Sequence, residues 1–133
     1  MDTTVATVTA GEQELAESRR QHGENHAQTL AARRTLAALY RRARRFDEAI
    51  AQLELLVDGL EQQFGADHPD ALEARQRLAF AFRLADRLAE AEDAYQAVFT
   101  GRARTLGEQH PDTLATQEHL AAVRRRRWHH VAG

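Results

Sequence analysis

Apolar residues recur along this chain at the spacing of one face of an α-helix, in two successive groups. The first group occurs twice, as Leu30, Leu36, Ala37 and Tyr40 and again as Leu72, Leu78, Ala79 and Phe82. After a break at Arg44-Arg45 or Asp86-Arg87 comes a second group, which is Ile50, Leu53, Leu56, Val57, Leu60 and Phe64, then Ala91, Tyr95, Val98, Phe99 and Leu106. The pattern predicts pairs of helices, which we name A and B in chain order, and no strands.

These pairs belong to a repeat of fixed length. The segment GENHAQTLAARRTLA begins at Gly23, GADHPDALEARQRLA at Gly65 and GEQHPDTLATQEHLA at Gly107, each 42 residues after the one before. A fixed period of this length is typical of stacked helical repeats. We therefore predict an all-α protein with repeats at 23–64 and 65–106 and a partial repeat at 107–127.

Glycine and proline support these helix boundaries. Gly65 and Gly107 stand where a left-handed residue ends a helix, and Pro69 and Pro111 stand in a first helical turn, where no N–H is needed. The first copy lacks the proline, and there we expect Asn25 to cap the helix.

The two ends of the repeat region are incomplete. Residues 1–22 are predicted to be a tail and a degenerate capping helix, because only Leu15 occupies an apolar position equivalent to Val57 and Phe99. The third copy has an A helix followed by RRRRWHH, with Arg124 at an aromatic position, and residues 128–133 are predicted to be a C-terminal tail in which His129 and His130 are disordered. We expect five or six helices in total.

Composition narrows the classes of protein that fit. With 43% hydrophobic and 29% charged residues the chain is expected to fold, and no apolar run approaches the roughly 20 residues of a membrane span. All 18 basic residues are arginine, which is typical of a GC-rich bacterial genome. We expect a soluble, cytoplasmic protein.

Few residues of the chain could support catalysis or hold a metal. Ser18 is the only serine, and the chain has no cysteine, no lysine and no glycine-rich phosphate loop. His22 and His26 have the spacing of neighbours on a helix, but Gly23 lies between them and no third ligand is suitably placed. His68 and His110 recur at the start of the A helix, which favours capping or packing. We expect no enzymatic activity, no cofactor and no metal site.

The sequence resembles the tetratricopeptide repeat, in the 42-residue variety found in kinesin light chains. Residues that match the entrance of the family's helix A are His68-Pro69-Asp70-Ala71-Leu72 and His110-Pro111-Asp112-Thr113-Leu114. Packing positions of helix A are matched by Leu36-Ala37 with Tyr40 and by Leu78-Ala79 with Phe82, and the start of helix B by Phe46-Asp47-Glu48-Ala49 and Leu88-Ala89-Glu90-Ala91. The resemblance implies an α-solenoid in which A helices line a concave groove and B helices form the outer face.

The A segments carry positive net charge and the B segments carry negative net charge. The A segments 26–45, 68–87 and 110–127 carry net charges of +6, +1 and +2, whereas the B segments 46–67 and 88–109 carry −6 and −2. The groove implied by the resemblance is therefore basic. Its predicted partner-binding residues are Arg34, Thr35, Arg41, Gln76, Arg77, Phe80, Arg83, His119 and Arg125.

These features favour a non-catalytic protein–protein interaction module, an adaptor or regulatory protein, that binds an acidic peptide or helix. Where family members often place an asparagine that clamps the peptide backbone, this chain has Thr35, Arg77 and His119, so arginine–carboxylate pairs are expected instead. The groove arginines can alternatively pair with acidic residues of neighbouring B helices.

Two other functions are considered. Tyr95, Val98 and Phe99 could form a homodimer if no following unit covers them. Nucleic acid could bind the basic groove and the run Arg124 to Arg127, but a net charge of −2 opposes that function.

Overall fold

The computed structural model describes residues 3–132, and six α-helices make up nearly all of that range. They are α1 (Thr3–His22), α2 (Ala27–Arg42), α3 (Phe46–Phe64), α4 (Pro69–Leu84), α5 (Leu88–Leu106) and α6 (Pro111–Ala132). The described residues contain no strand. The predicted all-α class is confirmed.

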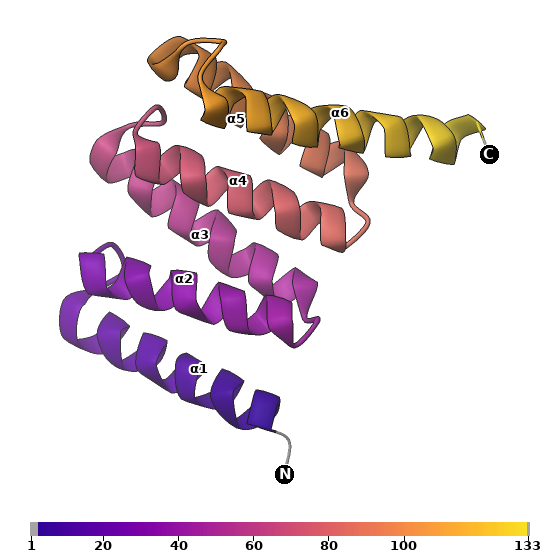
Figure 1. Ribbon diagram of the computed structural model, residues 1–133. Helices are drawn as coiled ribbons and strands as arrows, with labels where there is room; N and C mark the ends of the chain where they lie inside the picture. The colour runs from indigo at the N-terminus through magenta and orange to yellow at the C-terminus, as the bar shows by residue number, and fades with distance from the viewer. Residues whose placement is uncertain (1–2, 133) are drawn as a thin grey trace.

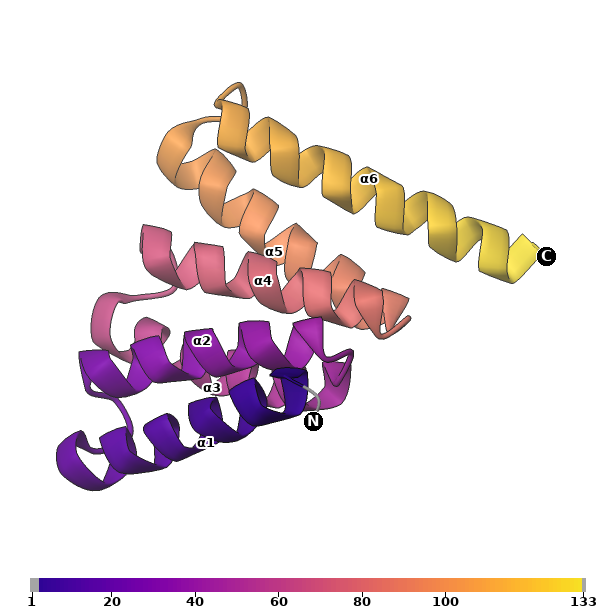
Figure 2. The same ribbon diagram turned by 60° about the horizontal axis from the view of Figure 1, so that its bottom comes forward.

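The helices stack in chain order, so that each one packs on the helices before and after it (Figures 1 and 2). The A helices α2, α4 and α6 lie on the near side of the stack in Figure 1, and the B helices α3 and α5 lie behind them. This is the arrangement of an α-solenoid, because each helix buries its apolar face only against its neighbours.

Histidine caps all three A helices. The Nδ1 atoms of His68 and His110 each accept a hydrogen bond from the backbone N–H two residues later, at 3.1 Å. His26 does the same at 3.1 Å, so the prediction that Asn25 caps the first A helix is wrong. An imidazole nitrogen at this position satisfies a free N–H of the first turn as a shorter polar side chain would. Asn25 donates instead to Gln62, at 3.3 Å.

The turns between helices use two backbone conformations. Gly65 and Gly107 end the B helices with φ of 92° and 96° and ψ of 158° and 153°. Their φ is positive, as predicted, but this ψ lies in a region that is essentially open only to glycine. Arg44 and Asp86 end the A–B turns with φ of 61°, in the left-handed helical region.

Both ends of the chain are more helical than predicted. Helix α1 extends over 20 residues and buries Val8, Gly11 and Leu15 against α2. Helix α6 continues to Ala132, so the expectation that His129 and His130 are disordered is wrong. No turn interrupts α6 at the repeat position where Arg44 and Asp86 lie in the turns after α2 and α4. Gly133 and residues 1–2 lie outside the described part.

Helix α6 also covers the residues that could have formed a homodimer if no following unit covered them. Tyr95 and Val98 are buried, and Phe99 is half-buried, because α6 packs on α5. An A helix without its B helix is therefore sufficient to close this side of α5.

Candidate ligand-binding groove

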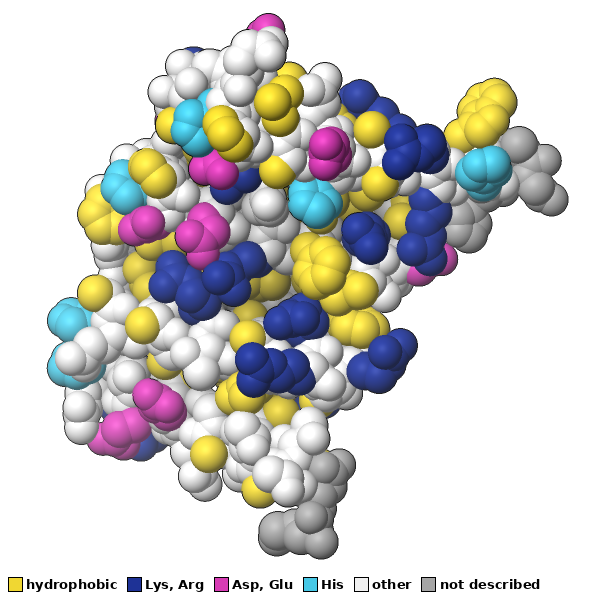
Figure 3. All heavy atoms as spheres, in the orientation of Figure 1, with side chains coloured by type: hydrophobic (Ala, Val, Ile, Leu, Met, Phe, Trp, Pro, Cys, Tyr) yellow, Lys and Arg dark blue, Asp and Glu magenta, His cyan; other side chains and the backbone are white. Residues whose placement is uncertain are grey.

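A cavity of about 300 Å³ opens on the face formed by the A helices. Its walls come from α2, α4 and α6, and its floor comes from α3 and α5 between them. Its lining residues are Arg34, Ala37, Ala38, Arg41, Ala49, Leu53, Gln76, Arg77, Phe80, Ala81, Tyr95 and His119. Figure 3 shows arginine side chains gathered around a hydrophobic patch in the middle of this face.

Phe80 lies between two arginines at the edge of the cavity. The guanidinium carbon of Arg41, on α2, is 5.9 Å from the centroid of the ring, and that of Arg83, on α4, is 5.5 Å from it. Both distances are within the range of cation–π attraction. The ring thus helps to hold two positive charges beside an apolar surface.

Three arginines of this face have no carboxylate partner. Arg34, Arg41 and Arg83 form no ion pair within 4.0 Å among the described residues, and the Nε atom of Arg34 is buried without a hydrogen-bond partner there. A buried donor without a partner costs roughly 1–3 kcal/mol. These positions therefore favour an acceptor that the chain itself does not supply.

Most arginines on other faces of the A helices are paired, as the alternative interpretation predicted, whereas Arg42 and Arg125 form no ion pair among the described residues. Arg33 is buried and pairs with Glu24, and Arg75 pairs with Glu61 of α3. In the arginine run of α6, Arg124 and Arg127 both pair with Glu92 of α5, at 3.2 and 2.6 Å. Arg126 pairs with Asp86 at 3.4 Å. Most of the run is therefore neutralised by its neighbours.

Arg77 is intermediate between these two groups. It lines the cavity, but its Nη2 atom lies 3.0 Å from Oε1 of Glu73, one turn earlier on α4. This pair is exposed, so its net contribution is at most about 1 kcal/mol. An incoming carboxylate would compete with Glu73 for Arg77, which makes this arginine a weaker site than Arg34.

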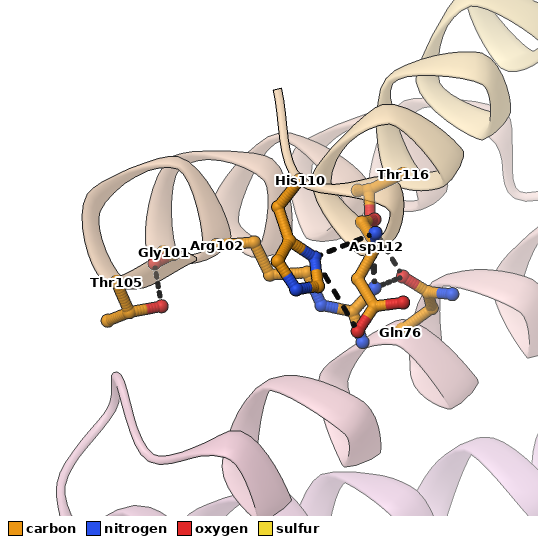
Figure 4. Close-up of polar contacts among 7 residues, drawn as sticks. All are labelled: Gln76, Gly101, Arg102, Thr105, His110, Asp112 and Thr116. Carbon is orange, nitrogen blue, oxygen red and sulfur yellow. Dashed lines mark hydrogen bonds and ion pairs between the residues drawn. The ribbon is translucent and has the colours of Figure 1, made fainter. Parts of the chain in front are cut away.

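Gln76 is held by residues from two other helices, as Figure 4 shows. Nη1 of Arg102, on α5, donates to Oε1 of Gln76 at 2.7 Å and to Oγ1 of Thr116, on α6, at 2.9 Å. The Thr116 hydroxyl also donates to Oε1 of Gln76, at 2.9 Å. Because arginine carries only donors, the amide atom facing it must be the oxygen. The –NH₂ group of Gln76 therefore points away from Arg102 and has no partner among the described residues.

Two stacked rings line the cavity, Tyr95 from the floor on α5 and His119 from the wall on α6. The rings of Tyr95 and His119 lie 5.4 Å apart, centroid to centroid, at an interplanar angle of 11°. Burial raises the pKa of the Tyr95 hydroxyl, and the positive charge of Arg83 opposes this shift. The phenol is therefore neutral at physiological pH, and its hydroxyl can donate a hydrogen bond.

Comparison with known proteins identifies the family. The Tetratricopeptide repeat family model matches residues 29–70 and 71–112, two consecutive stretches of one period each. The chain belongs to the tetratricopeptide repeat family. Such repeats generally mediate protein–protein interaction and are typically non-enzymatic scaffolds. Among curated proteins, none matches this sequence.

Solved structures agree with this family. The nearly identical tetratricopeptide-like repeats of a kinesin light chain from Podosopora anserina are 28% identical to this chain, with a TM-score of 0.80. The match covers 90% of this chain and 57% of that one, so this chain spans just over half of its relative. A single-substitution variant of the same protein gives the same values. BtubC from P. vanneervenii, 14% identical over 96% of this chain and 68% of that one, shares the fold with a TM-score of 0.68.

The tetratricopeptide fold brings most of the predicted partner-binding residues together. Arg34, Arg41, Gln76, Arg77, Phe80 and His119 line the cavity, and Arg83 lies beside it on Phe80. Thr35 is exposed and Arg125 is exposed on α6, and neither lines the cavity. Arg102, Thr116 and Tyr95 were not predicted as site residues. Tyr95 lines the cavity, and Arg102 and Thr116 hold Gln76 from α5 and α6. These places depend on which residues of different helices meet in the fold, and a helical period does not encode this.

The described residues were also compared with the requirements of a metal site and of a membrane-spanning helix. The rings of His22 and His26 stack 4.4 Å apart, and no group of three or more His, Asp or Glu side chains in the described part could hold a metal ion. Within residues 3–132, none of the helices combines the length and the apolar character that crossing a membrane requires.

Proposed function

We propose that this protein is a non-catalytic adaptor or regulatory module that binds an acidic peptide or helix in the groove of its A helices. The observation that carries this proposal is the set of cavity-side arginines without carboxylate partners, Arg34, Arg41 and Arg83, around Phe80. Arginines elsewhere on the A helices are largely paired.

Acidic side chains suit these arginines for a specific reason. A guanidinium binds a carboxylate through two parallel hydrogen bonds, and such charge-assisted bonds are about twice as strong as neutral ones. A carboxylate between α2 and α4 would also supply the acceptor that the buried Nε of Arg34 lacks. The gain there is larger than for an exposed arginine, because the unsatisfied donor is already removed from water.

The remaining lining residues suit a polypeptide rather than a small acid. The –NH₂ group of Gln76, oriented by Arg102 and Thr116, can donate to a backbone carbonyl without a further loss of side-chain freedom. Phe80 and Tyr95 supply an apolar surface of the kind that often dominates binding energy. We therefore expect the ligand to present acidic residues on both sides of an apolar side chain.

The test uses fluorescein-labelled peptides in which Glu and Asp flank a single Leu or Phe, with Lys-flanked versions as controls, titrated by fluorescence anisotropy. Arg34→Glu and Arg41→Glu should each weaken binding of the acidic peptides about tenfold or more, as expected for charge-assisted hydrogen bonds. Arg42→Glu is the matched control, because Arg42 is exposed on the same helix and does not line the cavity.

Two results would contradict the proposal. One is equal binding of acidic and Lys-flanked peptides, which would mean that the arginines do not select charge. The other is an equal loss of affinity in the Arg41→Glu and Arg42→Glu variants, which would mean that only the overall charge of the protein matters.

A further inference from the structure

Helix α6 has a face that no other helix of the described chain covers. In the two complete repeats, a leucine of the A helix packs on the B helix that follows it. Leu30 and Leu72 are each 4% exposed, and they contact α3 and α5 at Gly59 and Gly101. Leu114 occupies the same repeat position on α6 and is 39% exposed. Figures 1 and 2 show α6 at the edge of the stack, with its C-terminal half extending past the other helices.

The opposite end of the stack is closed by polar residues. The side of α1 turned away from α2 carries the exposed residues Gln13, Glu17 and Gln21. Glu17 occupies the repeat position of Gly59 and Gly101, where Leu30 and Leu72 pack, and it is hydrogen-bonded to Arg20 and Gln21. Helix α1 of a second copy therefore does not fit Leu114 of α6. Head-to-tail stacking of copies is disfavoured.

The uncovered face of α6 is complementary to itself. Leu114, Glu118, Ala121, Arg125 and Trp128 follow one another at intervals of four and three residues, so they share one side of the helix. Leu114 and Trp128 are exposed at its two ends, Trp128 by 69%. Glu118 and Arg125 are exposed between them and form no ion pair among the described residues. Two half-buried alanines, Ala121 and Ala122, lie at the centre.

The order of charges selects one relative orientation. If two α6 helices pack antiparallel about the point between Ala121 and Ala122, Glu118 of each copy faces Arg125 of the other. Parallel packing would instead place Glu118 next to Glu118 and Arg125 next to Arg125, which is repulsive. The central alanines allow close approach of the helices, and Leu114 lies toward Trp128 of the second copy.

We propose that two copies of this protein associate through α6, in an antiparallel contact with two-fold symmetry centred on Ala121 and Ala122. Such a contact is isologous, so it closes with two copies and does not propagate. Glu118 and Arg125 stand two periods after Arg34 and Arg41, but neither of them lines the cavity. The two proposals are tested separately, because Arg34→Glu and Arg41→Glu leave the contact residues of α6 unchanged.

The first experiment measures mass and tryptophan fluorescence of the full chain across a dilution series. Light scattering should give twice the single-chain mass of 15.0 kDa at high concentration and 15.0 kDa on dilution. Trp128 is the only tryptophan of the chain, so its emission should shift to shorter wavelength as the dimer forms. A single-chain mass at every concentration would overturn the proposal, and so would masses that grow beyond two copies.

Charge reversal tests the orientation. Glu118→Arg and Arg125→Glu should each weaken the dimer about tenfold or more, and the double variant should recover most of that loss. Glu108→Arg is the control, because Glu108 is exposed in the turn before α6 and outside this face. A double variant no better than the single variants would exclude the antiparallel contact, provided that circular dichroism shows all variants to be equally helical.

Cross-linking tests the position of the axis. The chain contains no cysteine, so Ala121→Cys or Ala122→Cys introduces one thiol per copy. Mild oxidation should link two copies, because a disulfide requires Cα atoms within about 7 Å and only residues near the axis meet their own counterparts. Ala97→Cys, exposed on α5, should remain unlinked. Equal cross-linking at Ala97 would overturn the proposed axis.

Discussion

One leucine position tests the repeat architecture quantitatively. Leu72 and Leu114 are separated by one period, yet Leu72 is 4% exposed against α5 and Leu114 is 39% exposed because no helix follows α6 in the described chain. Replacing each by alanine makes the same chemical change at the same repeat position. The difference between the two losses of stability then reports how much the burial of this leucine against a following B helix contributes.

The expected magnitudes follow from burial. Leu72→Ala removes a nearly fully buried side chain and leaves a cavity beside Gly101, which costs about 3 kcal/mol of unfolding free energy. Leu114→Ala removes a side chain that is partly in water and leaves no closed cavity, so we expect a loss of about 1 kcal/mol. The Leu72 variant should thus be less stable by about 2 kcal/mol than the Leu114 variant.

Guanidinium unfolding followed by far-ultraviolet circular dichroism measures both losses. The protein must be dilute, because the α6 dimer would cover Leu114 and raise the cost of its replacement. An unchanged dependence of unfolding free energy on denaturant confirms that stability, rather than the unfolded state, has changed. Equal losses of unfolding free energy in the two variants would refute the reasoning, since the greater exposure of Leu114 would then not reduce its contribution to stability.

Three further perturbations test other parts of the structure. Gly65→Ala should lower stability by about 1–3 kcal/mol in thermal unfolding, because φ of 92° is strained for any side chain; an unchanged midpoint would contradict that backbone. Tyr40→Phe, which removes the hydrogen bond from the hydroxyl to Glu12 of α1, should cost about 1 kcal/mol in denaturant unfolding, and no loss would mean that this bond adds nothing. Arg127 and Arg124 hold the pKa of Glu92 below its usual 4.5, so its stabilisation is present above pH 4.5 and is lost as the pH falls through the lowered value. Glu92→Gln should flatten this part of the stability profile, and an unchanged profile would assign the acid sensitivity to other groups.

The repeat and its helices were predictable from the sequence. A fixed period places the same residue types at the same positions, and these alone set where an A helix begins after Gly65 or Gly107 and which face becomes apolar. Local chemistry is sufficient there, because helix formation and turn conformation depend on residues only a few positions apart. The groove residues Arg34, Arg41 and Phe80 could also be named, since the family resemblance implies which side of the A helix faces inward.

Ion pairing, side-chain orientation and burial could not be predicted from the sequence, because they depend on contacts between residues that lie far apart along the chain. Whether an arginine is free or paired is decided by a carboxylate on another helix, as Arg124 and Glu92 show, 32 residues apart. The orientation of Gln76 depends on Arg102 and Thr116, which meet it only in the folded stack. Burial at the C-terminal end of the stack also depends on neighbouring helices. Tyr95 is buried because α6 packs on α5, whereas Leu114 of α6 is exposed because no helix of the described chain packs on it. The sequence by itself determined the helices and their repeat, and the tertiary structure alone decided which charges and which apolar faces remain available to a partner.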